Sequence, residues 1–561
     1  ETRRMAYKDD QSNVMNAIHL ADALRQRDLT FHDGGSGQTE ALQLYQTAID
    51  YTLEKRLKLI EAGQPTDVSP SGTPVKNEFM LDYSNKSVDG LLCALYAAMG
   101  KQYFMANMFE KAVESHTRCL EIEPLYLDSV NSRGSTLIIL GKYEDAAKDL
   151  QLVMEMDENR FFKDAFTGMA KVLSAKEEVG SWEPMVAIIQ ELIPQLEQQY
   201  SSTSNDQAKQ HVAESLNRLY HVLFIYHDVK TKDTEAAWKA LSQGYEYKMT
   251  VLPPFQTAFE NQKLMQIKQI FNKGFWPDGV GSSTEVPIFI IGFVRSGSTL
   301  LERVLDAHPL VVGTGEDSVF NGRLDHIRNS IVQASMVGDS QVLVDTVQSL
   351  ADEVVDAMRQ RWKVIESNTS FEDNAHANPE RFADKMLTNY FNVGFIHMLF
   401  PNALILHVAR EPMDTVFSAF KHEFPPGGLD YTSEFSSLAQ MYHSYRDVME
   451  HWDKVLPGRV THVRYEDMVH DMPRVAKAII NATGLAWDED VLLFHKKKHA
   501  VNTLSTTQVR KGVYTHSLQA WRRYEEPLQA LVKLVGDRVR WDLTTTLPTY
   551  EPPEDFPEEQ E

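Results

Sequence analysis

The N-terminal half of the chain carries apolar residues at helical spacing, together with glycines that recur at a fixed interval. Gly100, Gly134 and Gly168 are 34 residues apart, and Phe109 keeps that register with Tyr143. Small residues stand where two helices would touch, and an apolar stripe with a spacing of three and four follows them. Small residues let helices approach closely, and the stripe can stack on the next helical pair. The pattern therefore predicts successive helix pairs over about 93–180.

A period of 34 residues is typical of tetratricopeptide (TPR) units, so residues 1–250 are interpreted as a TPR-like helical repeat domain. Its clear repeats span about 93–180, a Pro-, Ser- and Gly-rich loop is expected at 61–86, and a further helical pair at about 216–249. A plain helical bundle is the alternative. Repeat domains commonly present a concave surface to peptides, so a protein partner is expected on this surface.

A different pattern begins near residue 286, where the apolar run IFIIGF follows Pro287. This run predicts a buried strand, and the amphipathic segment LLERVLDAH predicts a helix shortly after it. Converging backbone N–H groups and a helix N-terminus favour a bound anion. The loop between this strand and this helix lacks the lysine of an ATP-binding P-loop, which argues against a kinase or ATPase. A simple tight turn from strand to helix is the alternative interpretation of the loop. The loop between strand and helix contains Arg295, Ser296, Gly297, Ser298 and Thr299.

Length and composition narrow the class of protein. The 561 residues, 43% of them hydrophobic and 24% charged, are typical of a globular chain with about two to four domains. The formal charge of -23 argues against broad binding to nucleic acid or to anionic membranes. Any anion site must therefore be local.

Two cysteines, Cys93 and Cys119, are too few for a disulfide framework and lack the CxxC spacing of zinc or redox sites. They favour a reducing compartment, so a cytoplasmic location is expected. A Golgi lumen is the alternative if a targeting segment precedes Glu1. No apolar run reaches the roughly 20 residues of a membrane span, and no metal-ligand spacing is present, so neither a span nor a metal is expected. The oligomeric state is not indicated.

The segment IIGFVRSGSTLLERVLDAHP resembles the 5′-phosphosulfate loop of sulfotransferases that use 3′-phosphoadenosine 5′-phosphosulfate (PAPS). With repeats ahead of it, the chain is similar to the TPR sulfotransferases, and LDAHPLVVGTGE is similar to tyrosylprotein sulfotransferases. Val294 stands in place of a common proline, and Ser298 in place of a common threonine. The resemblance covers about 216–537 and implies an α + α/β fold: TPR-like helical repeats (1–250), a connector (251–285), a P-loop-like α/β sulfotransferase domain with a parallel sheet (286–548) and an acidic disordered tail (549–561).

Matching the family's motifs to this chain implies roles for single residues. Glu316 in VVGTGED matches the general base, and Lys385 and Arg295 match cations that stabilise the leaving phosphate. Arg410 and Ser418 match the residues that hold the 3′-phosphate. The other donor contacts that the resemblance implies are the loop residues 296–299, Tyr465 near the adenine, and Ser505, Arg510 and Tyr514 in a segment that closes over the nucleotide.

Plainer interpretations of the same residues remain open. In these interpretations, Glu316 is an exposed acid in a loop, and Arg410 pairs with Asp414 and caps a helix. For the whole chain, the leading hypothesis is a PAPS-dependent sulfotransferase acting on a hydroxyl or amine of a protein, peptide, carbohydrate or small molecule. The alternative is a TPR-type interaction scaffold with an inactive sulfotransferase-like domain. No nucleic-acid partner is expected.

Overall fold

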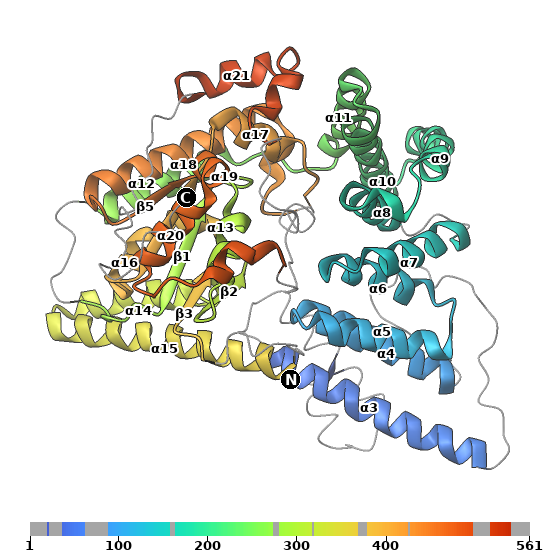
Figure 1. The fold of residues 1–561 in the computed structure, drawn as a ribbon, viewed down its shortest axis with the longest axis horizontal. Coiled ribbons are helices and arrows are strands. Elements are labelled where there is room, and N and C mark those ends of the chain that lie inside the picture. Colours follow the sequence, from blue (N-terminus) through green and yellow to red (C-terminus); the bar gives the residue numbers. More distant parts are fainter. Residues whose placement is uncertain are drawn as a thin grey trace, which may run out of the picture.

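The N-terminal part of the chain is a stack of helices (Figure 1). The computed structural model describes residues 20–21, 36–61, 88–157, 163–272, 280–316, 319–368, 378–424, 427–496 and 517–539. The helices of this part mostly pack in sequence order, one against the next. They are α3 (Ser36–Glu61), α4 (Val88–Met105), α5 (Phe109–Ile122), α6 (Leu127–Ile139), α7 (Tyr143–Met156), α8 (Asp164–Ala175), α9 (Glu183–Ser202), α10 (Asp206–Ile225) and α11 (Thr234–Met249), with the π-helical turn η2 (Tyr226–Thr231) between the last two.

The glycines at the 34-residue interval lie where these helices touch. A Cβ added to Gly100 of α4 would lie 2.7 Å from the imidazole of His116 in α5. Similarly, Cβ atoms on Gly134 and Gly168 would lie 3.1 and 3.0 Å from Leu150 of α7. The period read from the sequence thus corresponds to real helix contacts. Assignment of these pairs to the TPR class stays a prediction.

The two cysteines form a disulfide bond, Cys93–Cys119, which joins α4 to α5 across 26 residues of sequence. This bond was not predicted from the sequence, because two cysteines offer no pattern of spacing from which to infer it. Both side chains are buried in the contact between the two helices. The bond therefore links the two helices of one predicted repeat pair covalently.

The C-terminal part is built on a five-stranded sheet in the order β2-β3-β1-β4-β5, and every pairing is parallel. This arrangement confirms the predicted fold class of a helical N-terminal region followed by an α/β domain. Strand and helix bounds are β1 (Pro287–Gly292), α13 (Ser298–Asp306), β2 (Val311–Gly315), α14 (Leu324–Val337), α15 (Ser340–Asn368), β3 (Arg381–Asp384), α16 (Val393–Leu399), β4 (Leu404–Ala409), α17 (Pro412–Phe420), α18 (Phe435–Val455), β5 (Thr461–Arg464), α19 (Tyr465–His470), α20 (Met472–Ala482) and α21 (Gln529–Val535).

Alternate residues of the central strand face two different helical layers. Ile288 and Ile290 pack with α13 and α20, whereas Phe289 and Ile291 belong to the cluster that contains α18. A parallel sheet covered on both faces explains why β1 is apolar throughout. Helix α12 (Thr257–Ile270), from the predicted connector, also packs on α18.

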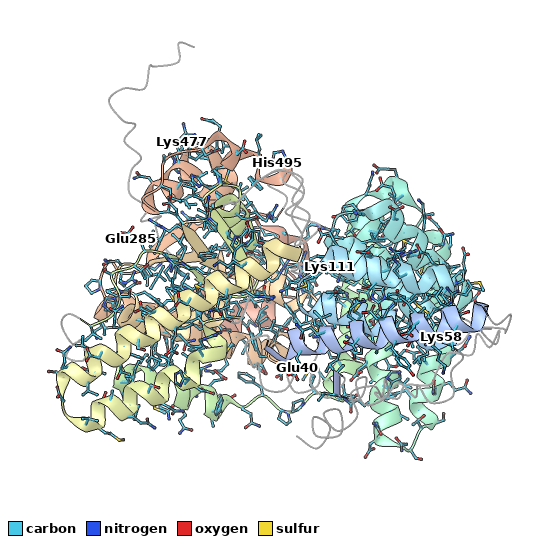
Figure 2. The ribbon with its side chains drawn as sticks, turned by 90° about the horizontal axis from the view of Figure 1, so that it is seen from below. Glu40, Lys58, Lys111, Glu285, Lys477 and His495 are labelled. Atoms are coloured by element: carbon cyan, nitrogen blue, oxygen red, sulfur yellow. A yellow bond between two sulfur atoms is a disulfide. The ribbon has the colours of Figure 1, made fainter. Side chains whose placement is uncertain are left out.

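The helical stack and the sheet domain lie side by side as two lobes (Figures 1 and 2). One continuous apolar cluster extends from the helices α5–α11 into the α18 face of the sheet. At the other end of the stack, Arg361 of α15 donates to the carbonyl of Ala106 over 3.0 Å. The two lobes are thus joined through a shared core. In the described ranges, none of the helices is long and apolar enough to cross a membrane.

Candidate active site at the carboxyl edge of the sheet

The loop from β1 to α13 has the backbone of an anion-binding turn. Arg295 has φ +71° and Gly297 has φ +103°, so the chain reverses sharply before α13 begins at Ser298. Any side chain at Gly297 would collide with the ring of Tyr465, since an added Cβ would lie 2.2 Å from Cδ2. Ser296 is buried, and its Oγ has no hydrogen-bond partner among the described residues. An anion at this helix N-terminus would supply a partner for such a group.

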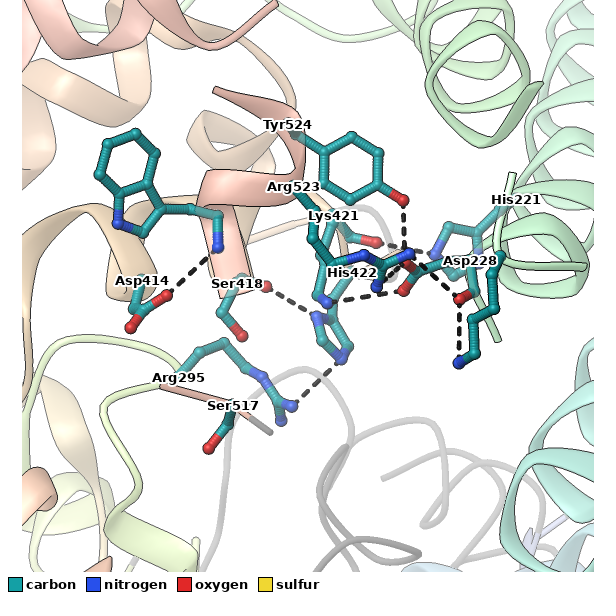
Figure 3. A network of polar contacts seen from close by, with 12 residues as sticks. His221, Asp228, Arg295, Asp414, Ser418, Lys421, His422, Ser517, Arg523 and Tyr524 are labelled. Atoms are coloured by element: carbon teal, nitrogen blue, oxygen red, sulfur yellow. Dashed lines mark hydrogen bonds and ion pairs between the residues drawn. The ribbon is translucent and has the colours of Figure 1, made fainter. Parts of the chain in front are cut away.

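Arg295 lies inside the loop and is held by a histidine from another element (Figure 3). Its Nη2 lies 3.1 Å from Nε2 of His422, which follows α17. The carbonyl of Arg295 accepts a hydrogen bond of 3.2 Å from Nη1 of Arg410. The planar guanidinium of arginine suits bidentate contact with phosphate or sulfate. The structure thus brings the two predicted phosphate-binding arginines together.

Arg410 follows β4 at the same edge of the sheet. Its guanidinium lies 4.7 Å from the ring centroid of Tyr465, and its Nη2 donates to the carbonyl of Ser517 over 2.5 Å. Tyr465 in turn shares a hydrogen bond of 2.8 Å with Oγ of Ser517. Arg410, Tyr465 and the described start of the C-terminal segment therefore form one cluster.

Asp414 is occupied by backbone groups. Its carboxylate accepts from the N–H groups of Gln519, at 2.6 Å, and Trp521, at 3.3 Å. The N-cap role at α17 belongs to Glu411, which accepts from the N–H of Asp414. Ser418 lies on α17 one turn beyond Asp414. These contacts leave the helix-cap interpretation of an Arg410–Asp414 pair without support from the geometry.

Glu316 and Lys385 are in contact at the carboxyl ends of β2 and β3. Lys385 Nζ lies 2.9 Å from Oε1 of Glu316 and 3.6 Å from Oε2 of Glu302. The Lys385 side chain is almost completely buried, while that of Glu316 is 55% exposed. Glu302 also accepts from the N–H of Gly315 over 2.7 Å, which ties the end of β2 to α13. A buried ammonium and an accessible carboxylate are thus in direct contact.

Charge within this triad follows from burial and proximity. Burial disfavours the charged form of Lys385, but the attraction of Glu302 and Glu316 outweighs it and raises the pKa of Lys385. For Glu302, burial raises the pKa, and the ammonium of Lys385 acts against that shift. Lys385 is therefore protonated at neutral pH. A permanently charged ammonium at this position can stabilise negative charge that develops next to it.

All five strands contribute to one edge. Arg295, Glu316, Lys385, Arg410 and Tyr465 follow the carboxyl ends of β1, β2, β3, β4 and β5 respectively. Open α/β sheets bind ligands at this edge, near the point where the strand order reverses. The predicted residues Ser505, Arg510 and Tyr514 lie outside the described residues. Among the described residues, no group of three or more His, Cys, Asp or Glu side chains is arranged to hold a metal ion.

Two residues that support the site were not predicted from the sequence. Glu302 is a buried acid on α13, and the only signal in the sequence is a carboxylate on the apolar face of the predicted helix. His422 lies four residues after Ser418, and that spacing was a usable sign of proximity along one helix face. Glu302 lies within the segment IIGFVRSGSTLLERVLDAHP, but the resemblance implied no role for it, and His422 lies outside the quoted segments.

Comparison with known proteins agrees with this geometry. Residues 287–489, which contain all five strands, match the model of the sulfotransferase family. The resemblance predicted from the sequence is thereby confirmed for this domain, and the comparisons leave the TPR assignment open.

Two curated relatives extend the likeness. An uncharacterised protein of Aquifex aeolicus is 27% identical over 334 residues, which are 56% of this chain and 41% of that protein. Protein-tyrosine sulfotransferase 2 of Gallus gallus is 27% identical over 259 residues, 43% of this chain and 64% of that protein. The chain thus spans less than two thirds of the length of either relative.

A solved structure also matches the sheet domain. The sulfotransferase domain of a Synechococcus olefin synthase aligns with 48% of this chain and 98% of its own length, at 21% identity and a TM-score of 0.31. A superposition this loose adds nothing to the assignment, which rests on the family model and the sequence relatives.

Proposed function

We propose that the sulfotransferase-family domain of this chain transfers a sulfuryl group from PAPS to an acceptor hydroxyl or amine. The observation that carries the proposal is the direct contact of buried Lys385 with exposed Glu316 at the sheet edge that also holds Arg295. A base, a fixed cation and a phosphate-binding arginine are what sulfuryl transfer requires. An interaction scaffold with an inactive domain has no need of this combination.

The residues have separate tasks in the proposed reaction. Bound PAPS supplies a sulfur atom whose bond to the bridging phosphate oxygen breaks as the acceptor oxygen or nitrogen attacks. Glu316 takes the acceptor proton, since its carboxylate is accessible. Lys385 and Arg295 stabilise the negative charge of the departing 3′-phosphoadenosine 5′-phosphate. Arg410 and Ser418 hold the 3′-phosphate.

The remaining donor contacts come from the rest of the edge. In the phosphate loop, Ser296, Gly297, Ser298 and Thr299 surround the 5′-phosphate, with Ser296 Oγ buried and open to a partner. Tyr465 supports the guanidinium of Arg410 and lies beside the adenine. Ser505, Arg510 and Tyr514, outside the described residues, are assigned to the segment that closes over the nucleotide.

A tyrosine side chain of a protein or peptide is the acceptor that we propose. Several sequence relatives are named protein-tyrosine sulfotransferases, and a helical repeat domain offers a surface for a peptide chain. The Cys93–Cys119 disulfide favours an oxidising compartment over the cytoplasmic location expected from the cysteine count.

Transfer of radiolabelled sulfate from PAPS to tyrosine-containing peptides tests the proposal. Glu316→Gln keeps the shape of the site but removes the base, so kcat should fall by about 10² to 10⁴ while affinity for 3′-phosphoadenosine 5′-phosphate changes little. Glu285→Gln is the matched control, because Glu285 is also an exposed acid, 58% accessible, but lies ahead of β1. Full activity of Glu316→Gln, or nucleotide binding without transfer to any acceptor, would contradict the assignment and favour the scaffold.

A further inference from the structure

The chain segment 420–424, directly after α17, is held by side chains of the helical domain. Four backbone carbonyls of this segment accept hydrogen bonds from α10 and α11. The donors are Tyr245 Oη to Phe420 and, at 3.4 Å, to His422, His221 Nε2 at 3.0 Å to Lys421, and Lys248 Nζ at 3.2 Å to Phe424. The last carbonyls of a helix lack partners within the helix, so Tyr245 supplies a donor for Phe420, the last residue of α17, and the other donors hold the residues after it.

Ion pairs, drawn in Figure 3, and a ring contact add to this attachment. Asp228 in η2 accepts from Tyr524 Oη at 2.8 Å and from Arg523 Nη1 at 2.8 Å, and it lies 3.8 Å from Nζ of Lys421. The indole of Trp238 stacks on the ring of Phe420 with centroids 6.0 Å apart. The segment therefore has few ways to move independently of the helical domain.

His422, within that segment, reaches the phosphate loop. Its Nδ1 lies 2.7 Å from the carbonyl oxygen of Ser418, and because a carbonyl only accepts, Nδ1 must carry the proton. Its Nε2 is then the acceptor for Nη2 of Arg295 at 3.1 Å. Burial, with the nearby charges of Arg295 and Lys421, holds the pKa of His422 well below its ordinary value. The ring is thus a neutral acceptor with a fixed tautomer.

We propose that the helical domain forms part of the donor site, because it holds His422 and His422 in turn fixes the guanidinium of Arg295 in the phosphate loop. This inference rests on the proposed function in so far as the loop binds the donor. His422 is a positioning residue, since it acts through Arg295. The helical domain accordingly has a role in donor binding in addition to any role in binding partners.

Substitutions at His422 test the first link. His422→Phe keeps the ring but removes the acceptor, and His422→Gln restores an acceptor oxygen of similar reach. Affinity for 3′-phosphoadenosine 5′-phosphate, measured by calorimetry, should fall about tenfold or more in His422→Phe and stay within about threefold of wild type in His422→Gln. Equal affinity of the Phe variant and wild type, or no rescue by Gln in folded protein, overturns the proposal.

Tyr245→Phe tests the link to the helical domain, and the same helix supplies its control. Tyr247, two residues on, donates to Glu197 within the helical domain over 3.1 Å. Both substitutions remove one hydrogen-bonded hydroxyl from α11, but only Tyr245→Phe frees the carbonyls of Phe420 and His422. Donor affinity should fall about threefold to tenfold in Tyr245→Phe and remain unchanged in Tyr247→Phe. Equal affinities of these two variants contradict the inference.

A second measurement separates this inference from the proposed function. In ¹⁵N spectra of histidine-labelled protein, with the signal identified by its loss in His422→Gln, His422 should be neutral and protonated on Nδ1. Tyr245→Phe should shift this signal and Tyr247→Phe should not. If wild type binds no nucleotide, the proposed function fails, and an unshifted signal in Tyr245→Phe then overturns the link between the helical domain and His422 independently.

Discussion

Replacing Glu302 with glutamine isolates the electrostatic role of the acid buried beneath Lys385. The two charged groups lie 3.6 Å apart, and both side chains are less than a tenth exposed. With an effective dielectric constant of about 20, charges at this distance attract by about 4 to 5 kcal/mol. The glutamine oxygen can still accept from the N–H of Gly315, so the end of β2 keeps its attachment. Burial then dominates, and the pKa of Lys385 should fall below its ordinary value.

The pH profile of kcat/KM for sulfuryl transfer measures this effect. Lys385 acts as an ammonium, so activity disappears as the pH rises through its pKa. Wild type, whose Lys385 pKa is raised above the ordinary value, should keep its activity to a higher pH than Glu302→Gln, whose alkaline limb should move to lower pH. Circular dichroism at pH 7 and pH 9 controls for unfolding. Coincident alkaline limbs for the two proteins would refute the electrostatic reasoning.

Other substitutions test other parts of the structure. Gly297→Ala places a Cβ against Tyr465 at positive φ, so donor affinity measured by calorimetry should fall by at least about tenfold. Burial raises the pKa of Glu411 to about 7, so its ionisation above the unfolded-state value of 4.5 costs stability as the pH rises between those values. Glu411→Gln should remove that loss and stabilise the protein at pH 8 by up to about 3 kcal/mol in denaturant unfolding. Replacing Cys93 and Cys119 together with alanine should lower the free energy of unfolding by about 3 kcal/mol in the same assay.

The parts of the fold that were predictable are those coded by neighbouring residues. The apolar run of β1, the loop and the helix α13 follow one another directly, so their pattern predicts all three. The repeating glycines indicated helix contacts because their period of 34 residues can be read directly from the chain. Glu316, Lys385 and Arg410 were assigned by resemblance, and the strand order β2-β3-β1-β4-β5 explains why residues after separate strands share one edge.

The support of the site was not predictable, because its contacts join residues far apart in sequence. Arg295 and His422 are 127 residues apart, and Tyr245 and Phe420 are 175 apart. Such pairs leave no periodic signal in the chain. A buried histidine is also more often a packed side chain than a functional one, so His422 alone gave no reason for attention.

Tyr245 connects the two lobes, because it belongs to the helical lobe and donates to backbone carbonyls of the sheet lobe. A domain boundary at residue 250, drawn from the helical pattern, separates Tyr245 and Lys248 from the carbonyls of segment 420–424 that they bind. A fragment restricted to residues 286–548 would expose those carbonyls and the apolar cluster that both lobes share. Because the same segment carries His422, such a fragment should bind the donor more weakly even if its sheet forms. We therefore expect the helical lobe to support the proposed donor site through α10 and α11, which hold this segment.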